Sequence, residues 1–181
     1  INDDAEGIAM MLRYLHDRGH RKIAHLAGPK NLSTGRVRLK SFLTTAGELG
    51  LELPDEAIAV TNFFDENEGR RCTRQLLDSG FEFTAILCAN DRLALGAIDE
   101  LKQHGLVCPV DVSVTGYNDI PFLDLIPPGL TTIQIPQFDI GRVGAELLIT
   151  MMTSPETTIP RITILPVRLI ERGSVSTLAV T

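Results

Sequence analysis

The sequence predicts an α/β protein built on a largely parallel β-sheet. Short apolar or β-branched runs alternate along the chain with longer stretches in which apolar residues recur at positions i, i+3, i+4 and i+7. The short runs are typical of buried strands, and the longer spacing places apolar residues on one face of a helix. Because strands and helices alternate, we expect parallel strands that are connected by helical crossovers.

Five stretches carry the helical spacing. They lie at Ala5–Arg18, Leu39–Ala46, Glu66–Leu77, Ala94–Leu101 and Asp139–Met152. Gly19 follows the first stretch and Gly105 follows the fourth, where a glycine can take the left-handed conformation that closes a helix. Asp65, with Glu68 three residues later, predicts a capped start for the third stretch.

Six short runs have the character of strands. They lie at Ile23–Ala27, Ala57–Thr61, Ala85–Ala89, Val112–Thr115, Thr131–Ile135 and Ile162–Leu165. Segment 22–132 contains most of them, whereas the helices at 5–18 and 139–152 have few strands to pack against. The sequence therefore predicts one complete lobe and a second lobe that is represented only by pieces, as in a fragment.

The composition is that of an ordinary globular protein. The 181 residues are 44% hydrophobic and 22% charged, which allows one domain or two small ones with a real core. The formal net charge is −6, and the sequence has no dense Lys/Arg cluster. A free-standing nucleic-acid binder normally shows a basic face, so we do not expect this stretch alone to bind DNA.

The cysteines and the apolar runs bear on cellular location. Cys72, Cys88 and Cys108 have no paired spacing, which argues against a disulfide framework or a zinc site and favours free thiols in a reducing compartment. No apolar run approaches the roughly 18 residues that span a bilayer, and no signal peptide is visible. The chain opens at Ile1 rather than Met, so we expect its natural start to lie upstream. We predict a cytoplasmic protein that does not contact a membrane.

Polar side chains gather where four predicted strands end. In open α/β sheets ligands bind beyond the carboxyl ends of the strands, because loops and helix N-termini converge there. These ends present Arg36, Phe64, Asn90 and Asn118 with Asp119. Arginine offers a planar fork of donors, asparagine both donates and accepts, and a phenylalanine ring covers the apolar face of a ligand ring. The set predicts a neutral, polar, ring-shaped ligand such as a sugar or a nucleoside.

Each of these residues also has a purely structural interpretation. Arg36 fits a solvated first helical turn, and Phe64 beside Phe63 fits core packing. Asn90 fits a helix start, and Asn118 fits a turn. The sequence alone leaves these alternatives open.

Enzymatic motifs are absent from the sequence. It has no GxSxG, no HExxH and no phosphate loop that ends in GK[ST], and "GPKNLSTGR" resembles such a loop only faintly. Asp91 and Asp119 have no nucleophile or metal cluster nearby in the sequence, and the four histidines are scattered. We therefore predict binding without catalysis: no catalytic residue, no metal and no cofactor.

Five stretches together resemble the LacI/GalR family of bacterial transcription repressors. They are "DRGHRKIAHLAGP" (17–29), "GRVRLKSF" (35–42), "TAILCANDRLALGAIDELKQHGLVCPVDVSVTGYNDIP" (84–121), "PPGLTTIQIPQFDIGRVGAELL" (127–148) and "LPVRLIERGSV" (165–175). The resemblance covers essentially the whole chain, in the order and spacing of the family.

The resemblance implies a type I periplasmic-binding-protein fold, with two Rossmann-like lobes of parallel sheet flanked by helices and an effector between the lobes. Residues 1–20 and 136–163 would be remnants of the N-terminal lobe, and residues 21–132 and 166–175 would form the C-terminal lobe. Most of the first lobe and the family's DNA-binding helix-turn-helix would lie outside this chain. The chain would cross between the lobes near His20, Ile135 and Pro166.

The resemblance also implies roles for the polar residues at the strand ends. Arg36 matches an arginine that grips sugar hydroxyls, and Phe64 matches an aromatic residue that stacks on the ligand ring. Asn90 matches the polar residue of the family's "AND" motif, behind which Asp91 would cap a helix.

Two further positions bear on ligand choice. Asn118 falls where the family usually has an aspartate, so this chain lacks a charge and a strong acceptor there. Thr34 lies in the variable part of the first loop, where the family sets its specificity.

The function implied is the effector-sensing core of a LacI-type transcriptional regulator. A sugar, a sugar derivative, a nucleoside or a purine would favour one arrangement of the lobes and so change the DNA affinity of a homodimer. Operator DNA would be bound only through the N-terminal domain outside this chain. The chief alternative on the same fold is a periplasmic sugar-binding protein of a transport system, which a cleavable leader upstream would indicate.

Overall fold

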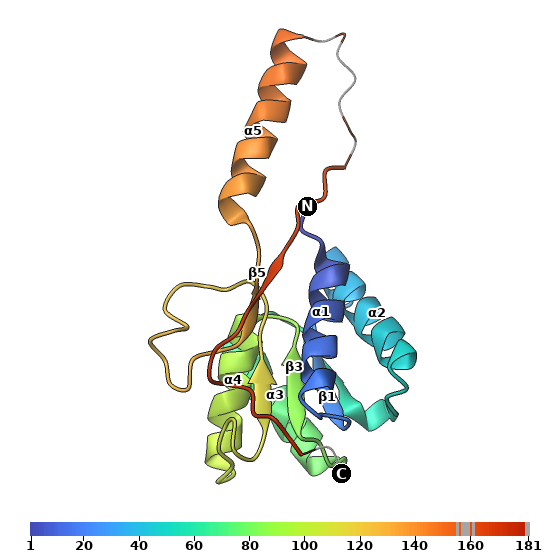
Figure 1. Cartoon of the computed structure of the whole chain (residues 1–181), viewed down its shortest axis with the longest axis vertical. Helices are drawn as coiled ribbons and strands as arrows, with labels where there is room; N and C mark the ends of the chain where they lie inside the picture. The colour runs from blue at the N-terminus through green and yellow to red at the C-terminus, as the bar shows by residue number, and fades with distance from the viewer. Residues whose placement is uncertain (155, 157–159, 161, 180–181) are drawn as a thin grey trace.

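A four-stranded parallel sheet forms the centre of the molecule in the computed structural model, which describes residues 1–154, 156, 160 and 162–179 (Figure 1). The strand order is β2-β1-β3-β4. The strands are β1 (Ile23–Ala27), β2 (Ile58–Val60), β3 (Ala85–Cys88) and β4 (Ser113–Thr115). The predicted α/β class and the parallel sheet are confirmed, and the observed strands are up to two residues shorter than the predicted ones.

Helices cover both faces of the sheet. On one face lie α1 (Asp4–Asp17) and α2 (Ser33–Glu48), and on the other lie α3 (Glu66–Asp78) and α4 (Asp91–Gln103). Successive side chains of a strand point to opposite faces, so a strand between two helical layers is buried throughout. All five residues of β1 are buried for this reason.

The core consists of two clusters, one on each face of the sheet. The first cluster packs Leu76 and Leu93 of the α3–α4 layer against Leu26 of β1. The second packs Leu12 of α1 and Phe42 of α2 against the other face. A short 3-10 turn (Asp55–Ala57) leads into β2.

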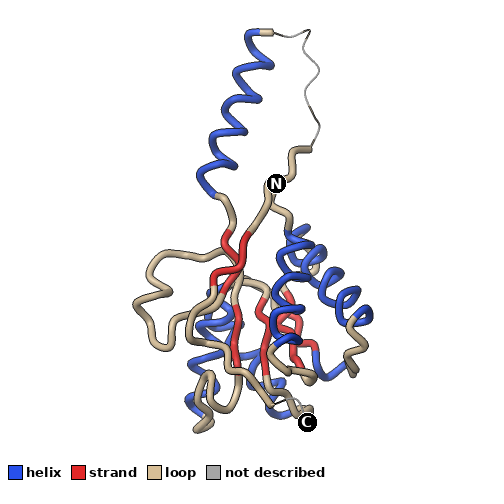
Figure 2. The backbone as a smooth tube through the Cα atoms, in the orientation of Figure 1, coloured by secondary structure: helices blue, strands red, loops and turns tan. Residues whose placement is uncertain are grey.

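Three segments of the chain leave this body at one end. Residues 1–3 pair with the segment around Leu165, whose N–H donates to the Ile1 carbonyl at 2.9 Å and whose carbonyl accepts from the Asp3 N–H at 3.0 Å. Beside them β5 (Thr132–Gln134) and β6 (Arg168–Ile170) form an antiparallel pair. We call residues 1–3, β5 and β6 the neck of the molecule. Figure 2 shows the neck between the body and α5.

Helix α5 (Gln137–Thr153) extends from this neck away from the sheet (Figure 1). None of its residues is buried, and its apolar side chains Leu148, Ile149 and Met152 are between 58% and 74% exposed. The predicted N-terminal-lobe remnant at 136–163 corresponds to α5 and the segment after this helix. Residues 155, 157–159 and 161 of that remnant lie outside the described residues.

Two sequence predictions need correction. Residues 1–20 do not form a remnant of a separate lobe, because Ile8, Met11, Leu12 and Leu15 of α1 are fully buried in the core cluster that covers β1 and β3. The segment 162–165 is not a strand, because only Leu165 forms a bridge, to Asn2, and the C-terminal strand is β6 instead.

The three cysteines are free thiols, as expected, with Cys72 and Cys88 buried. Within the described part of the chain, no helix is both long enough and apolar enough to cross a membrane.

Candidate functional site

The loops that follow the four parallel strands are tied to one another. The side-chain amide of Asn90, after β3, donates to the Phe64 carbonyl, after β2, at 3.3 Å. The Asp91 N–H donates to the Tyr117 carbonyl, after β4, at 3.0 Å. The Phe64 ring lies directly over Gly28, after β1, where a side chain would collide with it. The predicted convergence of strand ends is therefore present.

Arg38 of α2 is the arginine that joins this convergence. It is only 4% exposed, and its Nη1 donates to the Ala89 carbonyl at 2.6 Å. Its Nε and Nη2 donate to Asp4 Oδ1 at 3.1 and 2.7 Å. Nη2 also lies 3.5 Å from Asn118 Oδ1, and the guanidinium stands 3.7 Å from the centre of the Tyr117 ring. A buried arginine needs such partners, because an unpaired charge there would be costly.

The sequence prediction missed Arg38 and chose Arg36, two residues earlier. The Arg36 side chain is exposed in the first turn of α2, and its Nη1 donates to the Lys30 carbonyl of the preceding loop at 3.1 Å. A signal for Arg38 did exist in the sequence. It lies on the same helix face as Gly35, Phe42 and Ala46, so a charged residue interrupts the buried face of an amphipathic helix.

The structural roles of Asn90 and Asp91 differ from the predicted ones. Asn90 is the N-cap of α4, and its Oδ1 accepts from the Leu93 N–H at 2.8 Å. Asp91 does not cap the helix. Its fully buried carboxylate accepts from the Ile120 N–H at 2.9 Å and from the Thr132 hydroxyl. Burial raises the pKa of Asp91, while the Thr132 and Ile120 donors lower it in part.

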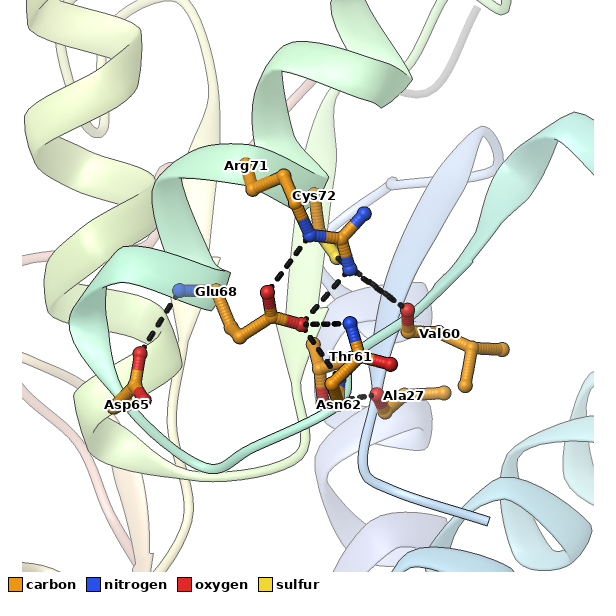
Figure 3. A network of polar contacts seen from close by, with 8 residues as sticks. All are labelled: Ala27, Val60, Thr61, Asn62, Asp65, Glu68, Arg71 and Cys72. Carbon is orange, nitrogen blue, oxygen red and sulfur yellow. Dashed lines mark hydrogen bonds and ion pairs between the residues drawn. The ribbon is translucent and has the colours of Figure 1, made fainter.

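Phe64 is positioned by a polar network at the start of α3, drawn in Figure 3. The Glu68 carboxylate accepts from the Asn62 backbone N–H at 2.5 Å and from Arg71 Nε at 2.8 Å. The hydrogen bond from Arg71 lowers the pKa of Glu68 to about 2, so this carboxylate stays charged. Asp65 caps α3 through the Glu68 N–H at 3.0 Å, as predicted. The network fixes the loop after β2, and with it the half-buried Phe64.

Thr34 lies at the mouth of this region, half-buried in a hollow of about 380 Å³. Asp4, the partner of Arg38, lines the same hollow, together with Ile140 of α5 and Ile164. The hollow therefore connects the polar cluster around Arg38 with the segments that cross the neck.

Asn118 joins the polar cluster from the turn after β4. Its φ is 118°, in the left-handed region that few residues other than glycine adopt. Its N–H donates to the Ile133 carbonyl at 2.8 Å, and its Oδ1 faces Arg38. The structure thus brings Asn90, Asn118 and the loop of Phe64 together with Arg38, places Thr34 at the adjoining hollow, and leaves Arg36 outside.

The hydrogen-bonding groups of the cluster around Arg38 suit a ligand that carries hydroxyl groups. Within the described residues, no group of three or more His, Cys, Asp or Glu side chains is arranged to hold a metal ion. The cluster offers a guanidinium, two amides and a threonine hydroxyl beside an aromatic ring, which are groups that exchange hydrogen bonds with a polyol.

Comparison with known proteins identifies the fold. Residues 12–175 match the family described as periplasmic binding protein-like domain. The chain belongs to this family. The ribose operon repressor of Escherichia coli strain K12 is 36% identical over 162 residues, which are 90% of this chain and 48% of that protein. The chain spans about half the length of the curated relatives it matches.

Two solved structures of transcriptional regulators resemble it closely. A LacI family regulator from Enterococcus faecium with bound ribose has a TM-score of 0.85 at 30% identity and covers 98% of this chain and 65% of its own. The lac repressor dimer bound to operator and the anti-inducer ONPF has a TM-score of 0.90 at 28% identity, covering 97% and 60%. The resemblance to the LacI/GalR type is thereby confirmed, and these relatives are regulators of transcription rather than enzymes.

Proposed function

We propose that the chain is the effector-sensing core of a cytoplasmic LacI-type transcriptional regulator, that it binds a neutral sugar or a nucleoside, and that it catalyses no reaction. The observation that carries this proposal is the buried Arg38, which faces Asn118 beside the hollow lined by Asp4 and Thr34. A relative with bound ribose supports a pentose as the first effector to test.

The effector is proposed to contact Asn118, Asn90, Thr34 and Phe64 from the strand ends, with Arg38 at the centre. The sequence-based prediction that Arg36 makes the arginine contact competes with this assignment. Only Arg38 is buried among other members of the cluster, so we favour it.

Calorimetry of the full-length protein with D-ribose separates the two arginines. Arg38→Lys retains the charge but loses the planar fork that serves Asp4, Ala89 and Asn118 together, so we expect the Kd to rise at least tenfold. Arg36→Ala should leave the Kd within about twofold of the wild type, because its side chain is exposed. Circular dichroism of both variants controls for folding. A tenfold loss in Arg36→Ala alone would return the role to Arg36.

The mechanism proposed is a shift in population between two arrangements of the lobes. An effector can change DNA affinity only through its different affinity for these arrangements, typically by about 1–3 kcal/mol. The three segments that cross the neck are the elements that a change in lobe arrangement must bend.

We also propose that the protein acts as a homodimer and contacts operator DNA through residues outside this chain. A relative forms a dimer on its operator. The loop after β4 carries Phe122, Leu125 and Ile126 with 69%, 70% and 46% of their surface exposed, which is unusual for large apolar residues on a monomer. Sedimentation of Leu125→Asp tests this, and an unchanged dimer mass would remove the loop from the interface.

A periplasmic sugar-binding protein is the second candidate, and only the shared fold favours it. The relatives that match most of this chain are repressors. Sequencing the DNA upstream of Ile1 decides between them, since a helix-turn-helix supports the regulator and a cleavable leader supports transport.

A further inference from the structure

The turn after β4 contains two neighbouring residues in a conformation that suits glycine. Asn118 has φ 118° and Asp119 has φ 58°. Such a conformation is unfavourable for most residues with a side chain, and it persists only where the surroundings fix it. The contacts of this turn therefore reveal what holds Asn118 in the polar cluster.

The Asp119 carboxylate bonds to β5 and to a residue that follows β6. Its Oδ2 accepts from Gln134 Nε2 of β5 at 2.6 Å, and its Oδ1 accepts from Arg172 Nη2, just beyond β6, at 2.8 Å. The carboxylate is 10% exposed and Arg172 is 20% exposed, so solvent screens this ion pair little. Gln134 Oε1 in turn accepts from Arg168 Nε of β6 at 2.7 Å.

The backbone of the turn also bonds to β5. The Asn118 N–H donates to the Ile133 carbonyl of β5 at 2.8 Å, and Asn118 forms a parallel bridge with Gln134. Arg172 Nη1 also donates to the Leu130 carbonyl, just before β5. One side of Asn118 thus faces Arg38. Its neighbour Asp119 is bonded to β5, which leads into α5, and to Arg172 just beyond β6.

We propose that Asp119 is a positioning residue that fixes Asn118 in the effector cluster and couples it to β5 and β6. Sliding of β5 against β6 would separate Gln134 from Arg172. The Asp119 carboxylate could then no longer bond to both residues. A ligand that holds Asn118 therefore favours one register of the neck. This inference deepens the proposed function and rests on it for its biological meaning, but the geometry can be tested without any effector.

The test is hydrogen exchange with mass spectrometry on the full-length, ligand-free protein carrying Asp119→Asn. An asparagine of the same shape presents one oxygen and one NH₂ group, so it can no longer accept from both Gln134 and Arg172. We expect exchange to accelerate at least fivefold in peptides that cover 116–120, 130–135 and 168–172. Peptides that cover β3 should be unchanged.

Asp99→Asn is the matched control. Asp99 accepts from Arg70 Nε at 2.5 Å in an ion pair between α3 and α4, remote from the neck and about 40% exposed. Hydrogen exchange at the neck of the Asp99→Asn variant should match that of the wild type. If Asp119→Asn accelerates exchange at 116–120 alone, or nowhere, Asp119 is a local ion pair and the coupling is rejected.

A second variant separates coupling from general loosening. Arg172→Gln removes the partner on the β6 side, and the double variant Asp119→Asn/Arg172→Gln should exchange at 116–120 no faster than the faster single variant. Fully additive accelerations would mean that the two residues act independently and would overturn the proposal. Failure of D-ribose or any sugar to bind the wild type would reject the proposed effector and leave this result unaffected.

Discussion

Helices α1 and α5 have similar sequence patterns and opposite surroundings. Both carry apolar residues at helical spacing, and the family resemblance predicted the same lobe for both. In the structure α1 buries seven residues against the sheet and α2, whereas α5 buries none. The comparison teaches that periodicity predicts an apolar face but not the surface that covers it, because the covering surface depends on the topology of the chain.

The largest expected effect breaks the core beneath α1. Leu12 is fully buried, and Leu12→Ala should lower the free energy of unfolding by about 3 kcal/mol, since it leaves a cavity that the neighbours fill only in part. Leu148→Ala in α5 is the matched change at a residue 58% exposed and should cost less than about 0.5 kcal/mol. Urea unfolding of the 181-residue chain measures both.

Equal losses in the two variants would contradict the contrast between the helices. A loss for Leu148→Ala that occurs only in the full-length protein would instead show that residues outside this chain cover α5.

The second prediction concerns pH and the same core face. His25 of β1 is fully buried, stacks on Phe42 of α2 with 4.3 Å between ring centres, and bonds the Leu87 carbonyl through Nδ1. Burial lowers the pKa of His25 to about 4. Between pH 6.5 and 4, His25 is therefore protonated in the unfolded chain but neutral in the folded chain. The free energy of unfolding falls as the pH falls through this interval.

The expected loss across that interval is roughly 3 kcal/mol at most. Urea unfolding at a series of pH values should show a flatter profile for His25→Leu than for the wild type. The slope should not vanish, because burial also lowers the pKa of His20 and acts in the same direction. Identical slopes in the two proteins would mean that His25 binds a proton as readily in the folded chain as in the unfolded chain.

Much of the body could be predicted from the sequence because its signals are local. Continuous apolar runs such as Ala85–Cys88 identify strands buried on both faces, and Asp65 identifies the start of α3. The meeting of the strand ends then follows from a general rule of parallel sheets.

The parts that could not be predicted depend on contacts between distant residues. Asp119 and Arg172 are separated by 53 positions, and neither has a neighbour in the sequence that indicates the pair. Arg36 and Arg38 both lie in the first two turns of α2, and the sequence prediction chose Arg36. The choice depends on which face of α2 meets the sheet, and Arg38 lies on that face with Phe42. Asp91 fits a cap by its position relative to α4 alone, but its true donors, Ile120 and Thr132, come from another part of the chain.

The smallest expected effect concerns how the two kinds of helix begin. Helix α4 starts at Asn90, whose side chain accepts from the Leu93 N–H, while α5 starts at Pro136 with no side-chain cap. Asn90→Ala should lower the free energy of unfolding by about 1 kcal/mol, since it leaves one N–H at the helix start without a partner. Gln137→Ala, at the first turn of α5, removes no such bond and should change it by less than about 0.5 kcal/mol. Thermal and urea unfolding of the two variants measure the difference. If Asn90→Ala is as neutral as Gln137→Ala, the Asn90 side chain contributes nothing to the stability of α4, and its burial at the strand end is explained better by the ligand that we propose it contacts.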